Sequence, residues 1–232
     1  MLEIKGLQKT SLVDYPSNIC STIFLGGCNF RCPFCHNREL VLTPEKLPSI
    51  SEEEILSFLE KRKGYIDGVT ISGGEPTIHA GLPEFVRKIK QIPLLVKLDT
   101  NGSNPAMLEK LLRAKLVDYV ALDIKSSREK YAQAAGAVVD LPALEKSISL
   151  IRELAPAYEF RTTAVPTLVE REDVEAIGKW LKGAERYALQ QFRPQNTLDA
   201  RFSKISPHSK ETLEEFARIA RAYFKNVEIR NV

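Results

Sequence analysis

Apolar runs with strand character alternate with helical patterns along almost the whole chain, and this alternation constrains the fold most strongly. Strands are predicted at residues 19–25, 68–72, 94–98, 119–124, 159–165 and 187–192. Between them, apolar residues spaced three and four apart predict helices at 51–62, 82–91, 106–115, 141–154 and 171–181. A last helix is expected at about 209–223, followed by a short strand near 227–229.

Strands that alternate with helices predict a parallel sheet with right-handed crossover connections. Six such units are too few for a closed eight-stranded barrel, but they suit an open barrel or a doubly wound sheet. Of the two, we expect an α/β fold built as a partial, open TIM-type (β/α)6 barrel with a mostly parallel sheet. Reactive groups gather at the carboxyl ends of the strands in both architectures.

The 232 residues contain no internal repeat, low-complexity tract or long linker, which favours one domain over residues 1–232. Within it we expect an N-terminal extension at about 1–18 and a core at about 19–195. A C-terminal helix and a short strand are expected at about 205–232.

Composition excludes several classes of partner. The 33 basic and 30 acidic side chains leave a net charge of +3, so nucleic acid is not an expected partner. The apolar stretches are too short to cross a membrane, and the opening MLEIKGLQKT lacks the apolar core of a signal peptide. We therefore expect a cytoplasmic location, where thiols do metal or redox work more often than they form disulfides.

Three of the four cysteines lie within eight positions, in GGCNFRCPFCHN at residues 26–37, directly after the first predicted strand. Cys28, Cys32 and Cys35 are spaced so that three thiolates can hold one face of a compact cluster. A disulfide would leave an odd thiol beside the pair. Cys20 lies inside the strand, about 16 Å back at roughly 3.3 Å per residue, so we interpret it as a small buried residue.

Two kinds of metal site are compatible with this spacing. A structural zinc site would use Cys28, Cys32, Cys35 and His36, but a histidine directly after a ligand cysteine strains the closed tetrahedral geometry. An iron–sulfur cluster with three protein ligands would instead leave one iron open. Because four cysteine ligands are usual for such clusters, an open iron indicates catalysis rather than simple electron transfer.

The stretch CNFRCPFC resembles the Cys-x3-Cys-x2-Cys signature of the radical S-adenosylmethionine (SAM) enzymes, including the aromatic Phe34 before the last cysteine. The resemblance implies a [4Fe-4S] cluster on Cys28, Cys32 and Cys35, with SAM bound at the open iron and cleaved to a 5′-deoxyadenosyl radical. Phe34 and His36 are then expected to border the adenine. Because the cofactors carry the chemistry, no side chain is expected to act as an acid or a base.

Motifs at three later strand ends resemble SAM-binding segments of the same family. The expected contacts with the methionine part of SAM come from Gly73, Gly74, Glu75 and Pro76. The stretch DTNG (Asp99, Thr100, Asn101) and the stretch DIK (Asp123, Lys125) resemble segments of pyruvate formate-lyase activating enzymes. That likeness implies a small monovalent-cation site at the two aspartates and Thr100, and a SAM contact by Lys125.

The fifth and sixth predicted strands supply the remaining candidates. Arg161 is expected to reach the SAM carboxylate or ribose, or else to form a structural salt bridge. The sixth strand lacks the SAM-contacting histidine of the pyruvate formate-lyase type, because the three histidines are His36, His79 and His208. Gln191 and Arg193 are the candidates to replace it.

The partner is suggested by the ending Cys35-His36-Asn37, by residues 6–9 and 11–16, and by QFRP at 191–194. These resemble activating proteins of glycyl radical enzymes such as anaerobic ribonucleoside-triphosphate reductase. The resemblance implies a glycyl radical enzyme as protein substrate and an electron donor such as flavodoxin or ferredoxin. The alternatives are a radical SAM enzyme for a small molecule, of the 7-carboxy-7-deazaguanine synthase type, and a non-catalytic zinc-binding interaction module.

Overall fold

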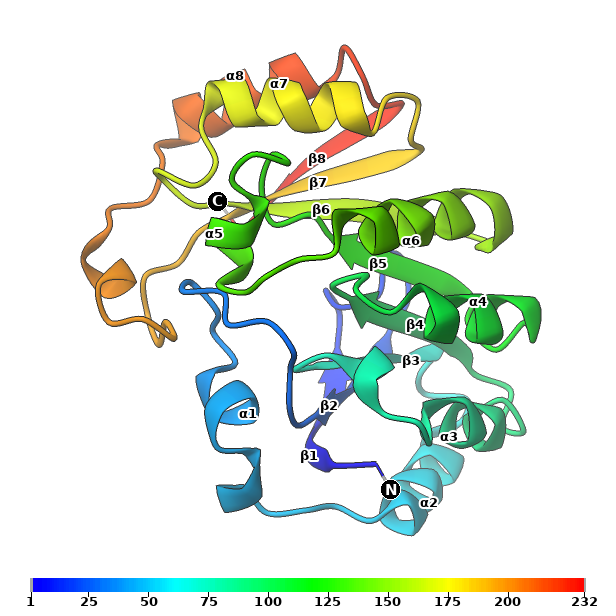
Figure 1. The fold of residues 1–232 in the computed structure, drawn as a ribbon. Coiled ribbons are helices and arrows are strands. Elements are labelled where there is room, and N and C mark those ends of the chain that lie inside the picture. The colour runs from blue at the N-terminus through cyan, green and yellow to red at the C-terminus, as the bar shows by residue number, and fades with distance from the viewer. Residues whose placement is uncertain (1, 232) are drawn as a thin grey trace. The chain divides into compact units, whose positions relative to one another are not determined.

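The computed structural model describes residues 2–231, and its strands form an eight-stranded sheet ordered from β1 to β8 as in the sequence (Figure 1). The strands are β1 (Ile4–Ser11), β2 (Cys20–Leu25), β3 (Gly68–Gly73), β4 (Leu95–Thr100), β5 (Tyr119–Asp123), β6 (Tyr158–Ala164), β7 (Arg186–Gln191) and β8 (Asn226–Arg230). Strand β1 is antiparallel to β2, whereas β2–β3, β3–β4, β6–β7 and β7–β8 are parallel pairs. The expectation of an open, mostly parallel α/β sheet is confirmed.

Helices follow the strands in the alternation that the sequence predicts. They are α1 (Arg38–Leu42), α2 (Glu52–Arg62), α3 (Leu82–Ile89), α4 (Pro105–Arg113), α5 (Tyr131–Ala135), α6 (Leu141–Leu154), α7 (Arg171–Trp180) and α8 (Lys210–Ala220). Short 3-10 helices occur at η1 (Pro44–Lys46), η2 (Pro76–Ile78) and η3 (Phe202–Lys204). Within residues 2–231, every helix is too short or too polar to span a bilayer.

Backbone contacts divide the chain into two compact units. Unit 1 consists of Met1–Asn29, Glu39–Ala121 and Pro142–Ala157. Unit 2 consists of Phe30–Arg38, Leu122–Leu141 and Tyr158–Val232. The division runs through β5, and the expectation of a single domain over residues 1–232 stays a prediction.

Unit 1 packs amphipathic helices on parallel strands, with α2 against α3. Helix α2 begins at Ser51, whose hydroxyl accepts from the Glu54 backbone N–H while the Glu54 carboxylate accepts from the Ser51 N–H. This capping box satisfies two backbone donors that the helix cannot pair internally. Helix α3 buries Leu82, Phe85 and Ile89, three and four residues apart, and so presents one apolar stripe to the strands.

Unit 2 is built from β6 to β8 with α7 and α8, which lie side by side above the strands in Figure 1. Gly178 of α7 lies against Tyr223, which follows α8, and a Cβ at Gly178 would lie 2.3 Å from Cδ2 of that ring. Beneath α8, the rings of Tyr187 and Phe224 stack with centroids 4.3 Å apart.

The structure differs from the sequence predictions at two strands. Strand β1 lies within the predicted N-terminal extension. Its sequence, IKGLQKTS, is mostly polar and lacks a strand pattern, because only the two ends of the strand are buried. Strand β4 continues to Thr100 instead of ending at residue 98. Asp99 and Thr100 are therefore fixed by the sheet itself and do not belong to the following loop.

A buried ion pair joins the two outer regions of the unit 2 sheet. The carboxylate of Glu159, on β6, is 1% exposed and accepts from the Arg230 guanidinium at 2.9 and 2.7 Å. Burial opposes the charge of Arg230, but the hydrogen bonds to Glu159 and Glu228 prevail, so the pKa of Arg230 is raised. The pair crosses β7, which lies between β6 and β8.

We expect Arg230→Met to lower the free energy of unfolding by about 3 kcal/mol, because it leaves the Glu159 carboxylate buried without its counter-charge. Chemical denaturation followed by circular dichroism measures this change. Lys225→Met is the control: it breaks an ion pair with Glu185 on the surface of the same unit and should leave the midpoint unchanged. Equal midpoints for the wild type and Arg230→Met would contradict the assignment.

Candidate functional site

The loop after β3 makes a close backbone contact with the segment that leads into the cysteines. Gly74 N–H donates to Leu25 O and Glu75 N–H donates to Gly27 O, both at 2.8 Å. A Cβ on Gly74 would lie 1.8 Å from Gly27 O, and Gly73 has a φ of +117°. Both glycines of the GGE motif are therefore required by the chain itself, because a side chain at either position would separate the two loops.

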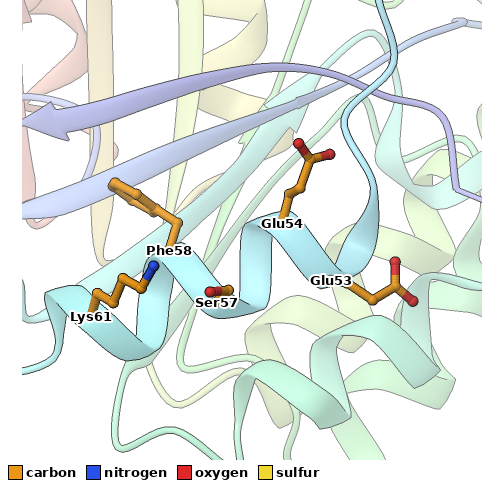
Figure 2. A pocket seen from close by; sticks show the side chains of 5 residues that line it. All are labelled: Glu53, Glu54, Ser57, Phe58 and Lys61. Carbon is orange, nitrogen blue, oxygen red and sulfur yellow. The ribbon is translucent and has the colours of Figure 1, made fainter.

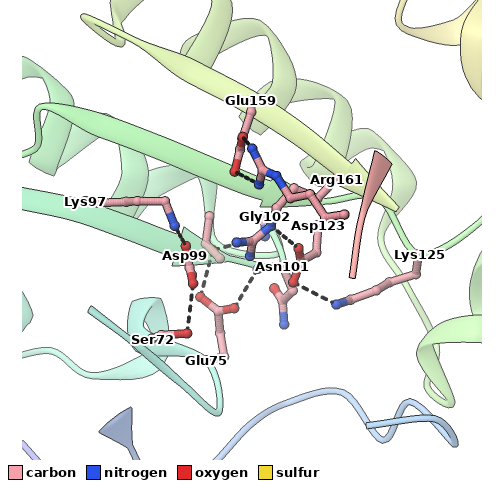
Figure 3. A network of polar contacts seen from close by, with 12 residues as sticks. Ser72, Glu75, Lys97, Asp99, Asn101, Gly102, Asp123, Lys125, Glu159 and Arg161 are labelled. Atoms are coloured by element: carbon pink, nitrogen blue, oxygen red, sulfur yellow. Dashed lines mark hydrogen bonds and ion pairs between the residues drawn. The ribbon is translucent and has the colours of Figure 1, made fainter. Parts of the chain in front are cut away.

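The carboxylate of Glu75 is buried and joins the end of β3 to the end of β4 (Figure 3). Its Oε1 accepts from Thr77 N–H at 3.0 Å, Thr77 Oγ1 at 2.5 Å and Thr100 Oγ1 at 2.7 Å. Its Oε2 accepts from Asn101 N–H at 2.7 Å. Burial raises the pKa of Glu75, and these hydrogen bonds offset part of that effect. The buried Pro76 then opens η2.

Asn101 lies beside Cys28 in unit 1. Its Nδ2 donates to Asn29 Oδ1 at 2.9 Å and lies 4.0 Å from Cys28 Sγ. Its Oδ1 accepts from Ser103 N–H at 2.9 Å, which fixes the orientation of the amide. The structure thus brings Asn101, predicted from DTNG, next to a predicted cluster ligand.

Asp99 makes contacts along the same strand end. Its Oδ1 forms an ion pair with the ammonium of Lys97, and its Oδ2 accepts from Ser72 Oγ at 2.9 Å (Figure 3). Lys97 is 1% exposed. Thr100, also predicted as a site residue, donates to Glu75 and accepts from Gly102 N–H at 3.1 Å.

In unit 2, main-chain contacts hold the cysteine segment on both sides of Cys32. Arg31 N–H donates to Ala135 O, and Asp199 N–H donates to Pro33 O, both at 2.9 Å. Gly136 has a φ of +59°, and a Cβ there would lie 2.1 Å from Arg31 O. Cys35 N–H donates to Cys32 O at 3.0 Å, which closes a turn between these two cysteines.

Asp123 is held between two cations of unit 2. Its Oδ1 accepts from Arg161 Nε at 2.8 Å and its Oδ2 from Lys125 Nζ at 3.1 Å. Burial by itself would raise the pKa of Asp123, but the charges of Arg161 and Lys125 hold it well below its usual range. Of the two roles considered for Arg161, the structure contains the salt bridge.

The remaining predicted residues of unit 2 differ in exposure. Phe34 is buried, whereas His36 is exposed. Gln191 Nε2 donates to His208 O at 2.7 Å, and its Oε1 accepts from Phe192 N–H at 3.1 Å. The Gln191 amide is therefore engaged by backbone groups at the position where a SAM-contacting histidine was sought.

The donor set suits an iron–sulfur cluster chemically. Cys28, Cys32 and Cys35 are not in disulfides, and burial raises the pKa of Cys35, so iron must displace its proton on binding. Within residues 2–231, no three His, Cys, Asp or Glu side chains are arranged around one single-ion position. A cluster makes a different demand, because each thiolate binds its own iron.

Surface grooves elsewhere involve other residues. A groove of about 450 Å³ runs along α2 and is lined by Glu53, Glu54, Ser57, Phe58 and Lys61 (Figure 2). A cavity of about 270 Å³ in unit 2 lies beside β7 and β8, next to Glu159 and Arg230. Neither is lined by a predicted cluster or SAM residue.

A sequence profile of the Radical SAM superfamily matches residues 22–184, which include all three clustered cysteines and the GGE, DTNG and DIK motifs. The chain belongs to the radical SAM superfamily. It is 36% identical to a protein of Methanocaldococcus jannaschii provisionally named a glycyl-radical enzyme activating enzyme, over 99% of this chain and 96% of that protein.

One further relative and one solved structure add to this comparison for the radical SAM enzyme. The pyruvate formate-lyase-activating enzyme of Clostridium pasteurianum is 28% identical over 85% of this chain and 84% of that protein. The structure of Streptococcus suis SuiB bound to S-adenosylmethionine superposes with a TM-score of 0.69 at 15% identity. The match covers 88% of this chain but about half of SuiB (48%), so it shows a shared fold.

Several residues of the network around these radical SAM motifs are missing from the sequence-based predictions. They are Thr77, Ser72 and Lys97 in unit 1, and Gly136 and Asp199 in unit 2. Only Lys97 carries a signal in the sequence, as a lysine enclosed by the apolar run LLVKL. The others contribute through contacts that depend on the fold.

We expect the stability difference between wild type and Asp123→Asn to be about 2 kcal/mol at neutral pH and to shrink as the pH falls below about 4. The folded-state pKa of Asp123 lies below its unfolded value, so the unfolded chain binds the proton first. The stabilisation is therefore complete above the unfolded pKa and is lost on acidification. Urea denaturation at a series of pH values measures it.

The control is Glu129→Gln, which changes an exposed carboxylate of the same unit. Its difference from wild type should stay constant over the same pH range. A difference between wild type and Asp123→Asn that does not change on acidification would show that the two cations do not lower the pKa of Asp123.

Proposed function

We propose that this radical SAM enzyme activates a glycyl radical enzyme, with anaerobic ribonucleoside-triphosphate reductase as the example that its motifs favour. When both are bound, a reduced [4Fe-4S] cluster and SAM supply a one-electron cleavage to methionine and a 5′-deoxyadenosyl radical, which takes a hydrogen atom from a glycine Cα of the partner. The electron comes from a donor of the flavodoxin or ferredoxin type. The chain itself binds, orients and shields these groups.

The cluster is assigned to Cys28, Cys32 and Cys35. Three thiolates leave the fourth iron for the amino and carboxylate groups of SAM. The hydrogen bonds of Arg31 and Pro33 hold the segment around Cys32 before any cluster binds. Asn101, whose amide lies 4.0 Å from Cys28 Sγ, supplies a donor to that ligand.

SAM binding is assigned to residues at the carboxyl ends of the strands. In unit 1, the backbone groups of Gly73 and Gly74 are the proposed contacts for the SAM amino group, because the Glu75 carboxylate already accepts four hydrogen bonds. In unit 2, Lys125 and Arg161 bring two positive charges against the single carboxylate of Asp123. Their guanidinium and ammonium groups are the proposed donors to the SAM carboxylate.

The observation that carries this proposal is the full-length similarity to the Methanocaldococcus jannaschii protein, together with the three-cysteine segment. The similarity spans nearly all of both chains, so the likeness does not end at the cofactor motifs. The four cysteines of the chain also leave no ligands for a second cluster. A single cluster in a chain of 232 residues suits an enzyme whose substrate is another protein.

We expect Cys28→Ala to abolish reductive SAM cleavage, because the cluster loses one of its three ligands. The assay is anaerobic reconstitution with iron and sulfide, followed by chromatography of 5′-deoxyadenosine and methionine with dithionite as reductant. Cys20→Ala is the matched control: Cys20 is fully buried, accepts from Thr70 Oγ1 at 3.6 Å, and should cost about 1 kcal/mol of stability while activity persists.

Equal loss of activity in the two variants would show that Cys20 is a ligand. A wild-type protein that is colourless and holds zinc but neither iron nor sulfide would support the zinc-binding interaction module instead.

The partner assignment is tested by electron paramagnetic resonance. The reduced, SAM-loaded protein is mixed with a candidate glycyl radical enzyme, and we expect a glycyl radical signal on that partner. A partner variant with alanine in place of its radical glycine should remain silent. Turnover of a purine-like metabolite without any partner protein would instead support a radical SAM enzyme of the 7-carboxy-7-deazaguanine synthase type.

A further inference from the structure

Lys97 is a charged side chain in the interior of unit 1. It lies on β4 between the buried Val96 and Leu98, pairs in register with Thr70 of β3, and is 1% exposed. A lysine that leaves water loses its hydration, so its ammonium needs a carboxylate or several acceptors to stay charged. The sheet supplies that partner two residues further along the same strand.

That partner is Asp99, and its carboxylate is occupied on both sides. Lys97 pairs with Oδ1, while Ser72 Oγ donates to Oδ2 at 2.9 Å. A metal cation bound to this carboxylate would have to lie within a few ångströms of the Lys97 ammonium. Like charges so close together in a protein interior repel each other strongly.

Neither charge has an easy alternative position. Lys97 cannot turn toward water without leaving a buried site, and Asp99 is itself only 16% exposed. In unit 2, Asp123 is likewise occupied, with Arg161 on Oδ1 and Lys125 on Oδ2. Asp99, which the resemblance assigned to a monovalent-cation site, therefore does not suit such an ion.

We propose that the Lys97 ammonium is a built-in replacement for the monovalent cation at Asp99, so that this chain binds SAM without one. The inference rests on the proposed function, because it concerns the binding of SAM. Lys97 is a positioning residue: it neutralises Asp99 and keeps that carboxylate directed along the strand end.

The test compares SAM affinity in potassium, sodium and tetramethylammonium chloride at equal ionic strength, by anaerobic calorimetry on the reconstituted protein. Tetramethylammonium is too large to enter a small cation site. The wild type should bind SAM equally well in all three salts. Lys97→Met should bind about tenfold more weakly in tetramethylammonium chloride and recover in potassium or sodium, a scale typical of coupled sites.

Two variants serve as controls. Lys97→Arg keeps the positive charge, so its affinity for SAM should not depend on the salt. Lys90→Met breaks the ion pair with Asp118 in the same unit, at 2.7 Å, and should show no dependence on cation identity. A merely structural role for Lys97 would change stability without making SAM affinity depend on which cation is present.

A wild-type affinity that falls in tetramethylammonium chloride would overturn the inference, as would a Lys97→Met variant that binds SAM equally in every salt. If Lys97→Met does not fold, thallium(I) NMR of the wild type decides: saturable thallium binding overturns the inference, and its absence supports it. An iron-loaded wild type that binds no SAM in any salt would remove the proposed function and this inference together.

Discussion

Parallel pairing of neighbouring strands determines where the polar groups of this protein meet. In unit 1, β2, β3 and β4 run in the same direction, so the segments that leave their carboxyl ends start from one edge of the sheet. The hydrogen bonds from Glu75 N–H to Gly27 and from Asn101 N–H to Glu75 are consequences of that alignment. In unit 2, the bond from Ile124 N–H to Arg161 O at 2.8 Å aligns the charges around Asp123 in the same way.

The interior charges are balanced by nearby residues of the same chain. Lys97 forms an ion pair with Asp99. Arg161 and Lys125 pair with Asp123, and Arg230 pairs with Glu159. Burying each ion is costly, so such pairs add little net stability. Removing one partner nevertheless lowers the free energy of unfolding strongly, because it leaves the other charge buried. Their value for a SAM enzyme lies in fixed dipoles and charges that need no reorganisation when a charged cofactor enters.

Sequence patterns predict the principal strands and the residues at their ends. The alternation of strand and helix patterns can be read from short segments, and in a parallel sheet the carboxyl ends of the strands then lie at one edge. Strand β1 was not predicted, because an edge strand exposes much of its length and needs few apolar residues. Thr77 was not predicted for another reason. Like Thr100 and Asn101, which were predicted for other roles, it comes within reach of Glu75 only once the backbone has folded. Lys97 was visible as a lysine in an apolar run, but its partner depends on which face of the strand it occupies.

The main-chain hydrogen bonds on both sides of Cys32 have a consequence for the lifetime of the enzyme. Arg31 and Pro33 form main-chain hydrogen bonds, which hold this segment without involving its sulfur atoms. Iron–sulfur clusters with an open iron are vulnerable to oxygen. A loop that lost its structure each time the cluster was destroyed would leave the polypeptide unusable. If the proposed cluster binds here, reloading it with iron and sulfide after oxidative loss would require no new folding of this segment.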